Sequence, residues 1–347
     1  MSRVINILDC TIRDGSYVTH YNWGKELIRD VVSSLSQLNI HFIEIGNGTG
    51  MGAFRNIPSA MADVEYYASA IPVKGDSLIG SFFIPGIGNT DDLKFFRDSG
   101  GDFVRIGINA TESQKALSFI KEAKSLGFFV CCNLMKTYAV SKFSIVMNAQ
   151  SIIDAGVDCI YIVDSAGGML PNQVVEYMLA IKEFYSGVKL GFHGHNNLLM
   201  ANANSLSAIE NGAEFADATL GGLGRGAGNA QLESLVAILQ KANLLDGQYD
   251  VWKLSDLTKR VLEKYKLTKN SSKREITVGI ANFHDSNTSM LERIALKYNV
   301  SPEELMVEVG RINIVNPSED LFEFAAQKLL EGETMKRFSP RYYHKKF

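Results

Sequence analysis

The chain has 347 residues, of which 46% are hydrophobic, and its 35 Lys and Arg against 38 Asp and Glu give a formal net charge of −3. This composition is typical of a compact globular protein and excludes a disordered or fibrous one. The charges form no long run of one sign, so nothing indicates binding to a nucleic acid or an anionic membrane. The apolar stretches are far shorter than the ~20 residues that span a bilayer, and a signal-peptide pattern is lacking, so we expect a cytoplasmic protein.

The four cysteines are predicted to be reduced and buried. They lie in or beside apolar segments, and they form no C-x-x-C pair of the kind that binds metals. Free thiols of this kind are typical of a reducing compartment.

Short segments rich in β-branched and aromatic residues recur along the chain, each followed by a longer stretch with helical periodicity. Two of these helical stretches are Lys25–Leu38 and Glu112–Leu126, in which apolar residues recur three and four positions apart. The predicted strands are Val4–Cys10, His41–Ile45, Ser77–Ile84, Asp102–Ile108, Phe128–Leu134, Asp158–Val163, Val188–His193 and Phe215–Leu220. Eight such units over about 240 residues predict an α/β protein with a closed (β/α)8 TIM barrel rather than a doubly wound sheet.

After the eighth unit the alternation ends, and the remaining chain has a helical pattern with two polar interruptions. We therefore predict two domains, a catalytic barrel over residues 1–244 and a helical C-terminal domain over residues 245–347. The basic tail at residues 341–346 is expected to be frayed.

The segment after the seventh predicted strand contains the most specific pattern in the chain, His193-Gly194-His195. Residues i and i+2 of a strand point to the same face, so the two imidazoles can bind one ion. Asp14, which follows the first strand, would complete a two-histidine, one-carboxylate site for a catalytic divalent metal. The other interpretation is that the two histidines form hydrogen bonds and do not act as metal ligands.

Charged and glycine-rich segments lie at other strand ends. Arg13 would place a cation beside the metal, and Glu44 would either orient Arg13 or be an ordinary carboxylate with its own partners. Residues 221–229 contain a formal G-x-G-x-x-A pattern, but it follows the last strand of the barrel, where loops often bind anions through backbone N–H groups. Gly224 and Gly226 of this loop, together with Asn47, are the candidate substrate-binding residues; a simple glycine-rich turn is the alternative.

Five segments make the chain resemble the metal-dependent TIM-barrel lyases and synthases that include 3-hydroxy-3-methylglutaryl-CoA lyases, with the closest resemblance to the 4-hydroxy-2-oxovalerate (4-hydroxy-2-oxoacid) aldolases. The resemblance extends into the C-terminal region, over residues 277–310. The five segments are LDCTIRDG (Leu8–Gly15), FIEIGNG (Phe42–Gly48), DSAGGMLP (Asp164–Pro171), GFHGHNN (Gly191–Asn197) and LGGLGRGAGNAQLE (Leu220–Glu233).

The resemblance implies roles for individual residues. Asp14, His193 and His195 would bind a divalent metal, most often Mn²⁺, with Mg²⁺, Co²⁺ or Zn²⁺ as alternatives, and Asn229 matches a position that approaches this metal. Arg13, held by Glu44, would stabilise the enolate of pyruvate. The metal would act as a Lewis acid toward a chelating 2-oxo acid.

The sequence differs from the aldolases at the two residues that move the proton of the 4-hydroxyl group. These enzymes have a His three residues after the metal-binding Asp and a Tyr in the C-terminal segment, whereas this chain has Tyr17 and His284. The two residue types are exchanged, and the pair could still relay a proton with His284 as base and Tyr17 as donor. His20 is a second candidate base, with an exposed loop histidine as its simpler interpretation.

The resemblance predicts a carbon–carbon lyase of the class II pyruvate aldolase type, which converts a 4-hydroxy-2-oxo acid to pyruvate and an aldehyde or catalyses the reverse. Two alternatives are an acyl-CoA-dependent Claisen-type lyase or synthase and a catalytically altered channelling subunit. Related aldolases pass their aldehyde to an aldehyde dehydrogenase through the C-terminal region, so such a partner is a further expectation, as is a homodimer.

Overall fold

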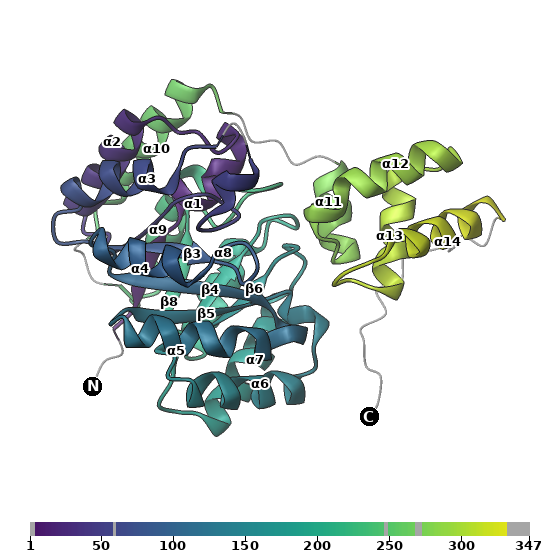
Figure 1. The fold of residues 1–347 in the computed structure, drawn as a ribbon, viewed down its shortest axis with the longest axis horizontal. Helices are drawn as coiled ribbons and strands as arrows, with labels where there is room; N and C mark the ends of the chain where they lie inside the picture. The colour runs from purple at the N-terminus through teal and green to yellow at the C-terminus, as the bar shows by residue number, and fades with distance from the viewer. Residues whose placement is uncertain (1–3, 58–59, 246–248, 268–272, 332–347) are drawn as a thin grey trace. The chain divides into compact units, whose positions relative to one another are not determined.

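A closed barrel of eight parallel strands, in the order β1 to β8, forms the centre of the fold (Figure 1). The computed structural model describes residues 4–57, 60–245, 249–267 and 273–331. Strand β1 pairs with both β2 and β8, which closes the sheet on itself. This is the (β/α)8 barrel predicted from the alternating segments.

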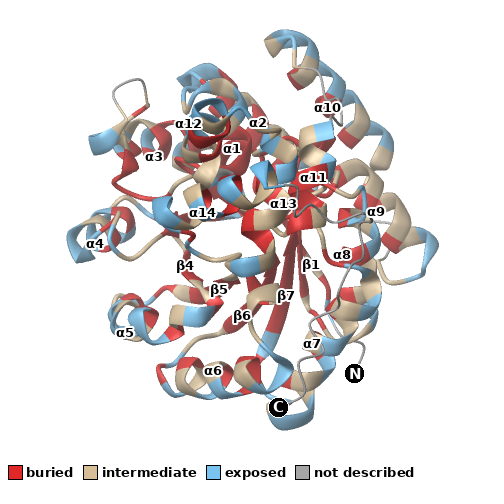
Figure 2. Cartoon of the chain, turned by 90° about the vertical axis from the view of Figure 1, so that its right-hand side faces the viewer, coloured by how far each residue is buried: buried red, intermediate tan, exposed pale blue. Residues whose placement is uncertain are grey.

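Each predicted strand segment corresponds to one strand of the structure, and the ends agree within two residues. The strands are almost entirely buried, as the red strands of Figure 2 show, because helices cover the outside of the barrel and side chains fill its interior. Their bounds are β1 Asn6–Asp9, β2 Phe42–Ile45, β3 Leu78–Phe83, β4 Phe103–Asn109, β5 Phe129–Met135, β6 Cys159–Asp164, β7 Lys189–Gly194 and β8 Phe215–Ala218.

The barrel helices present an apolar stripe to the strands. In α2 (Lys25–Gln37) the buried side chains are Leu27, Ile28, Val31, Val32 and Leu35, spaced as one face of a helix requires. The other helices are α1 Thr11–Asp14, α3 Asp63–Ala70, α4 Thr90–Asp98, α5 Leu117–Ser125, α6 Lys142–Asp154, α7 Pro171–Phe184, α8 Ala201–Glu210, α9 Leu232–Lys241 and α10 Val251–Tyr265. Helix α5 begins later than the predicted Glu112 because a 3-10 segment with non-helical backbone at that residue precedes it.

Aromatic rings from even-numbered strands fill the part of the barrel near the amino ends of the strands. The ring of Phe42 on β2 lies 5.6 Å from that of Phe103 on β4 and 5.0 Å from that of Phe215 on β8, measured between centroids. The next residues on the same faces are Glu44, Arg105, Tyr161 and Asp217, one from each even strand. Barrel interiors are built from such layers of four side chains contributed by alternate strands, usually branched apolar ones. Here three of the four members of the next layer, Glu44, Arg105 and Asp217, are charged, and we call these three the charged layer.

The described chain divides into two compact units, with the division after Asn270. The sequence placed the boundary between residues 244 and 245, whereas α10 packs with the barrel. Its Leu254, Leu257 and Val261 are buried, and Thr258 donates a hydrogen bond to Glu233 of α9 at 3.1 Å. Helix α10 therefore belongs to the first unit.

The second unit is helical and has its own apolar core. Its helices are α11 Lys273–Ala281, α12 Thr288–Tyr298, α13 Pro302–Ile312 and α14 Glu319–Leu330. Side chains from all four helices form this core, including the buried Val278, Ile294, Leu305 and Phe322. The basic tail expected at residues 341–346 lies outside the described residues.

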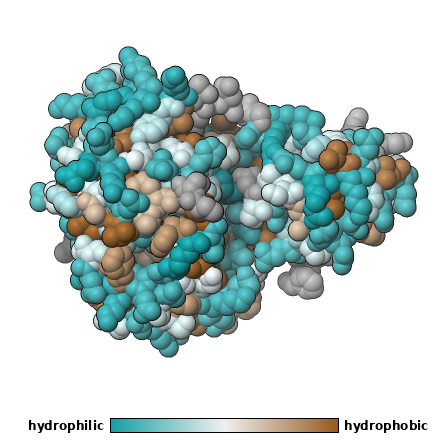
Figure 3. All heavy atoms as spheres, turned by 45° about the horizontal axis from the view of Figure 1, so that its top comes forward, coloured by the Kyte–Doolittle hydropathy of each residue, from teal (hydrophilic) through white to brown (hydrophobic). Residues whose placement is uncertain are grey.

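The surface and the cysteines agree with the composition. On the face drawn in Figure 3, hydrophilic side chains predominate, and hydrophobic ones gather in a few small groups. Among the described residues, none of the helices combines the length and apolarity needed to cross a bilayer. All four cysteines are free and buried, as predicted.

Candidate functional site

The segment that follows β1 is shaped by hydrogen bonds that place Asp14 at the carboxyl end of the barrel. Asp9, the last residue of β1, accepts hydrogen bonds from the backbone N–H and the hydroxyl of Thr11, at 2.9 and 2.7 Å. The Thr11 hydroxyl oxygen in turn accepts a bond from the backbone N–H of Leu220, which follows β8. The short helix α1 is thereby fixed, and Asp14 lies at its end, 1% exposed.

Asp14 meets His193, which lies near the end of β7, and His195, which directly follows this strand. One ligand atom from each of Asp14, His193 and His195 lies within 4.8 Å of the others, and all three residues are buried. Asp14 Oδ2 lies 3.7 Å from His193 Nε2. Burial opposes ionisation of Asp14, but nearby Arg13 and the two imidazoles outweigh it and hold the pKa of this carboxyl below its usual range. Asp14 is therefore an anion at neutral pH.

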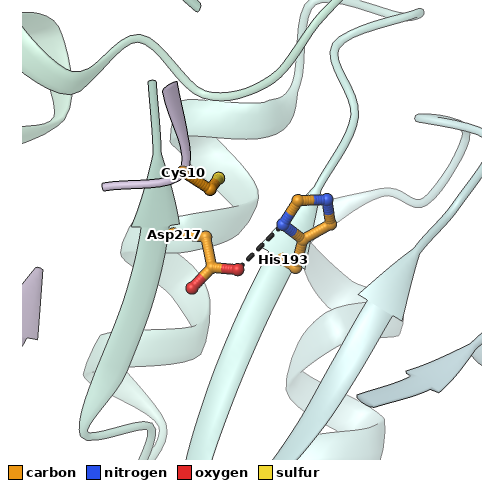
Figure 4. A group of neighbouring side chains, drawn as sticks. All are labelled: Cys10, His193 and Asp217. Carbon is orange, nitrogen blue, oxygen red and sulfur yellow. Dashed lines mark hydrogen bonds and ion pairs between the residues drawn. The ribbon is translucent and has the colours of Figure 1, made fainter. Parts of the chain in front are cut away.

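Asp217 of β8 determines how the ring of His193 is oriented. Its Oδ2 lies 2.8 Å from His193 Nδ1, and Figure 4 shows the other ring nitrogen turned away from this carboxylate. Cys10 lies beside this pair, but its Sγ contacts the carbonyl of Ala218 at 3.5 Å, and burial raises the pKa of the thiol well above its usual value. The group of Cys10, His193 and Asp217 therefore supports the ring of His193, and leaves Nε2 to face Asp14.

His195 is oriented by the glycine-rich loop after β8. Its Nδ1 lies 3.2 Å from the carbonyl oxygen of Gly228, and its Nε2 lies 3.3 Å from Nη2 of Arg225. Burial and the charge of Arg225 hold the pKa of His195 well below its usual value. The ring is neutral at pH 7, the form in which imidazole binds metals.

The predicted contact between Arg13 and Glu44 is present. Arg13 Nε donates to Glu44 Oε2 at 2.7 Å, Arg13 Nη1 lies 3.3 Å from Asp14 Oδ1, and the guanidinium lies over the ring of Phe82 at 4.8 Å. Burial disfavours the charge, but Glu44 and Asp14 outweigh it and raise the pKa of Arg13. A permanent cation is therefore fixed next to Asp14.

Two asparagines present polar atoms that have no hydrogen-bond partner within the described part of the chain. Asn229 donates from Nδ2 to Asp14 Oδ2 at 2.6 Å, whereas its buried Oδ1 is unpaired. Asn47 accepts from the backbone N–H of Thr49 at 2.9 Å, and its buried Nδ2 is unpaired. Gly224 approaches so closely that a Cβ there would lie 2.3 Å from Asn229 Nδ2. Gly226 has a positive φ of 57°, as a glycine turn requires.

The exchanged residues lie in different units. A Cβ at Gly48 would lie 2.3 Å from the ring of Tyr17, and burial raises the pKa of this tyrosine, so its hydroxyl stays protonated. His284 belongs to the second unit, where its Nδ1 lies 2.8 Å from the hydroxyl of Ser286. The pairing of Tyr17 with His284 stays a prediction. His20, the other candidate base, is exposed and has a left-handed backbone.

The sequence interpretation missed Arg105 and Asp217. Arg105 is fully buried, donates to Glu44 at 3.0 Å and also bonds to Asp217. Both residues occur singly inside apolar strands, at positions whose neighbours two residues before them are Phe103 and Phe215. A charge on the inward face of a barrel strand is the signal that could have identified them.

A divalent cation fits this group of side chains. The buried imidazoles of His193 and His195 and the ionised carboxylate of Asp14 match the donor set of catalytic two-histidine, one-carboxylate sites. The unpaired Oδ1 of Asn229, whose amide group contacts Asp14, offers a fourth oxygen. The carboxylate of Asp217 behind His193 resembles the outer partners that orient metal-binding histidines.

Known proteins resemble this chain over most of its length. The HMGL-like family model matches residues 4–261. A protein named 4-hydroxy-2-oxovalerate aldolase from Bacillus thuringiensis is 32% identical over 331 residues, which cover 94% of this chain and 96% of that protein. Another protein of that name, from Carboxydothermus hydrogenoformans, is 34% identical over 332 residues, covering 95% and 98% of the two chains.

Solved structures share the fold. The N-terminal domain of a putative aldolase from Bacteroides vulgatus has a TM-score of 0.70 and 26% identity, and the match covers 85% of this chain and 98% of that one. The HMG-CoA lyase of Bacillus subtilis has a TM-score of 0.65 at 18% identity, with coverage of 79% and 97%, and supports the fold alone. Since the family model covers the whole barrel and the relatives cover nearly the whole chain, this protein belongs to the HMGL-like family.

Proposed function

We propose that this protein is a divalent-metal-dependent aldolase that cleaves a 4-hydroxy-2-oxo acid to pyruvate and an aldehyde, or forms it in reverse. The observation that carries the proposal is the convergence of Asp14, His193 and His195 within 4.8 Å at the carboxyl end of the barrel, with Arg13 fixed beside Asp14. The names of the relatives supply the substrate class.

Asp14, His193, His195 and Asn229 Oδ1 are the residues that would hold the metal. A bound divalent ion supplies a Lewis acid for the keto oxygen of the substrate. Mn²⁺ is the ion we propose.

Arg13 is proposed to stabilise the oxygen that becomes negative when the bond between C3 and C4 breaks. Glu44 and the ring of Phe82 already hold its guanidinium, so little reorganisation is needed during the reaction. Asn47 Nδ2, which has no partner among the described residues, is available to donate to a substrate oxygen. Gly224 and Gly226 of the adjoining loop are proposed to bind the substrate through their backbone N–H groups. A side chain at Gly224 would collide with the amide of Asn229.

Breaking the C3–C4 bond also requires that the 4-hydroxyl lose its proton. We assign the base to His284 and the donor that positions this hydroxyl to Tyr17, which retains its proton because burial raises its pKa. The electron pair of the broken bond passes to the pyruvate half, and a proton added at C3 completes pyruvate.

The experiment that tests the proposal measures pyruvate release, coupled to lactate dehydrogenase, from 4-hydroxy-2-oxo acids of increasing chain length. We expect release with Mn²⁺ and none with a chelator. His193→Ala should abolish release, whereas His41→Ala, at an exposed histidine just before β2, should not. Metal binding without pyruvate release from any member of the panel would contradict the proposal, and acyl-CoA condensation would then be assayed.

We further propose that an aldehyde dehydrogenase is a partner of this protein and binds the helical second unit. Tagged protein mixed with an acylating aldehyde dehydrogenase from the same genome should retain it on a column. Loss of retention on removal of the residues after 270 would support the assignment, and retention by the barrel alone would contradict it.

A further inference from the structure

Arg105 is the one residue of the charged layer that contacts both carboxylates behind the site. It lies on β4, two strands from Glu44 on β2 and on the opposite side of the barrel from Asp217 on β8. Its Nη1 donates to Glu44 Oε2 at 3.0 Å, and its Nη2 donates to Asp217 Oδ2. The two ends of one guanidinium thus bind two carboxylates from different strands.

Each of these carboxylates orients a residue of the candidate site. Glu44 Oε2, which accepts from Arg105, also accepts from Arg13 Nε at 2.7 Å. Asp217 Oδ2, which accepts from Arg105, also contacts His193 Nδ1 at 2.8 Å (Figure 4). A continuous chain of charged contacts therefore runs from Arg13 to His193, with Arg105 in the middle.

The surroundings of Arg105 hold its side chain in one place. The guanidinium lies over the ring of Tyr161 at 4.4 Å, Nε lies 3.4 Å from Asn133 Oδ1, and the side chain is 0% exposed. Burial alone would disfavour its charge, but Asp217 and Glu44 outweigh burial and raise the pKa of Arg105 well above its usual value. A charged side chain therefore occupies a position that barrels usually fill with an apolar one, and two carboxylates compensate its charge.

We infer that Arg105 is a positioning residue that sets the geometry of the metal-binding His193 and of Arg13 together. This inference rests on the proposed function, because it assigns consequences to a site for metal and 2-oxo acid. A planar guanidinium suits this role, since its fork of donors reaches two carboxylates in fixed directions, whereas the ammonium of lysine is a single point.

The test measures two dissociation constants on purified full-length protein. One is the Kd of Mn²⁺ for the metal-free protein by calorimetry, which reports on His193. The other is the Kd of oxalate, a planar analogue of the pyruvate enolate, for the Mn²⁺-loaded protein, which reports on Arg13. Neither constant depends on turnover.

We expect Arg105→Met to raise both Kd values by about 10-fold or more, as changes to the outer partners of metal ligands do. Arg105→Lys should restore one Kd to its wild-type value and leave the other raised, because its ammonium can bond to only one of the two carboxylates. Arg97→Met is the matched control: Arg97 also bonds to an oxygen, that of Gly101 at 2.7 Å, and lies over an aromatic ring, that of Phe128, but on α4. Both constants should be unchanged there.

If Arg105→Met changes neither constant, or only one, the inference is wrong. If circular dichroism shows that this variant does not fold, Arg105→Lys decides the question. A rise in only one of the two Kd values supports the inference. Two Kd values that are both unchanged or both raised overturn it. Failure of the proposed function is distinguishable, because it is read on the wild-type protein, which would then either bind no Mn²⁺ or bind it without releasing pyruvate from any member of the panel. The inference is read on the Kd values of the Arg105 variants relative to the wild-type protein.

Discussion

In the two histidines proposed to bind the metal, Nε2 of His193 lies 3.7 Å from Asp14 Oδ2, and Nε2 of His195 lies 3.3 Å from Arg225 Nη2. Both rings are held through Nδ1. The partners differ: a carboxylate for His193 and the backbone carbonyl of Gly228 for His195. Either kind of partner fixes the tautomer and the orientation of an imidazole that binds a metal. The two rings are therefore held in place by different chemical groups.

At the residue scale, the exchanged pair gives the first prediction. Tyr17→Phe should lower turnover by between about 10- and 100-fold, because a positioned donor is lost, and His284→Ala should lower it further, by about 100-fold or more, because the base is lost. Steady-state release of pyruvate measures both. Near-full turnover in both variants would contradict the proposed proton relay between Tyr17 and His284. His20→Ala would then be the next variant to assay.

Asp9 gives a second prediction, on pH. Burial raises its pKa from 3.8 to about 7, so the folded protein favours the protonated carboxyl. Asp9 therefore stabilises the fold below about pH 4, and this stabilisation is lost as the pH rises toward 7. The expected loss is about 1.4 kcal/mol in the free energy of unfolding for each pH unit in that window.

Comparing the wild-type protein with Asp9→Asn by urea unfolding between about pH 4 and pH 8 isolates this contribution. The free energy of unfolding of the variant should increase relative to that of the wild-type protein as the pH rises, because asparagine carries no charge to bury. Parallel pH profiles for the two proteins would contradict the prediction.

At the scale of elements, a glycine on β4 leaves room for an aromatic ring from the neighbouring strand β3. A Cβ at Gly107 of β4 would lie 2.3 Å from the ring of Phe82 on β3, the ring on which the Arg13 guanidinium lies. The position of the Arg13 guanidinium therefore depends, through the ring of Phe82, on the absence of a side chain at Gly107.

Gly107→Ala should displace Phe82 and with it Arg13, and lower turnover by between about 10- and 100-fold while the Mn²⁺ Kd stays unchanged. The comparison is with Gly187→Ala, where a Cβ meets no atom within 4 Å. A fall in metal affinity equal to the fall in turnover would mean that the whole site is distorted instead.

How far the sequence predicted these elements depended on the range of the interactions. All eight strands followed from local runs of apolar residues, and Asp14, His193 and His195 followed from their places at strand ends. The bond from Arg105 to Asp217 joins residues 112 positions apart, and only the closed barrel brings β4 opposite β8. Helix α10 was assigned to the wrong side of the boundary because its amphipathic pattern does not say which core it covers.

At the scale of the whole molecule, the division after Asn270 predicts that the barrel is stable alone. A chain ending at residue 267 should give the circular dichroism of a folded α/β protein and bind Mn²⁺ as the full chain does. A chain ending at residue 244 should aggregate, because loss of α10 removes Leu254, Leu257 and Val261, each worth about 1.5–3 kcal/mol of burial. Equal solubility of the two truncated chains would contradict the assignment of α10.

The charged layer of Glu44, Arg105 and Asp217 also has a consequence for the order in which the protein folds. Asp217 lies on the last strand to leave the ribosome, and until β8 pairs with β1 the buried guanidinium lacks one of its two carboxylates. Intermediates that enclose Arg105 without β8 are therefore penalised electrostatically, which favours a cooperative final closure. Because the same strand orients His193, the step that completes the barrel is also the step that produces a binding-competent enzyme.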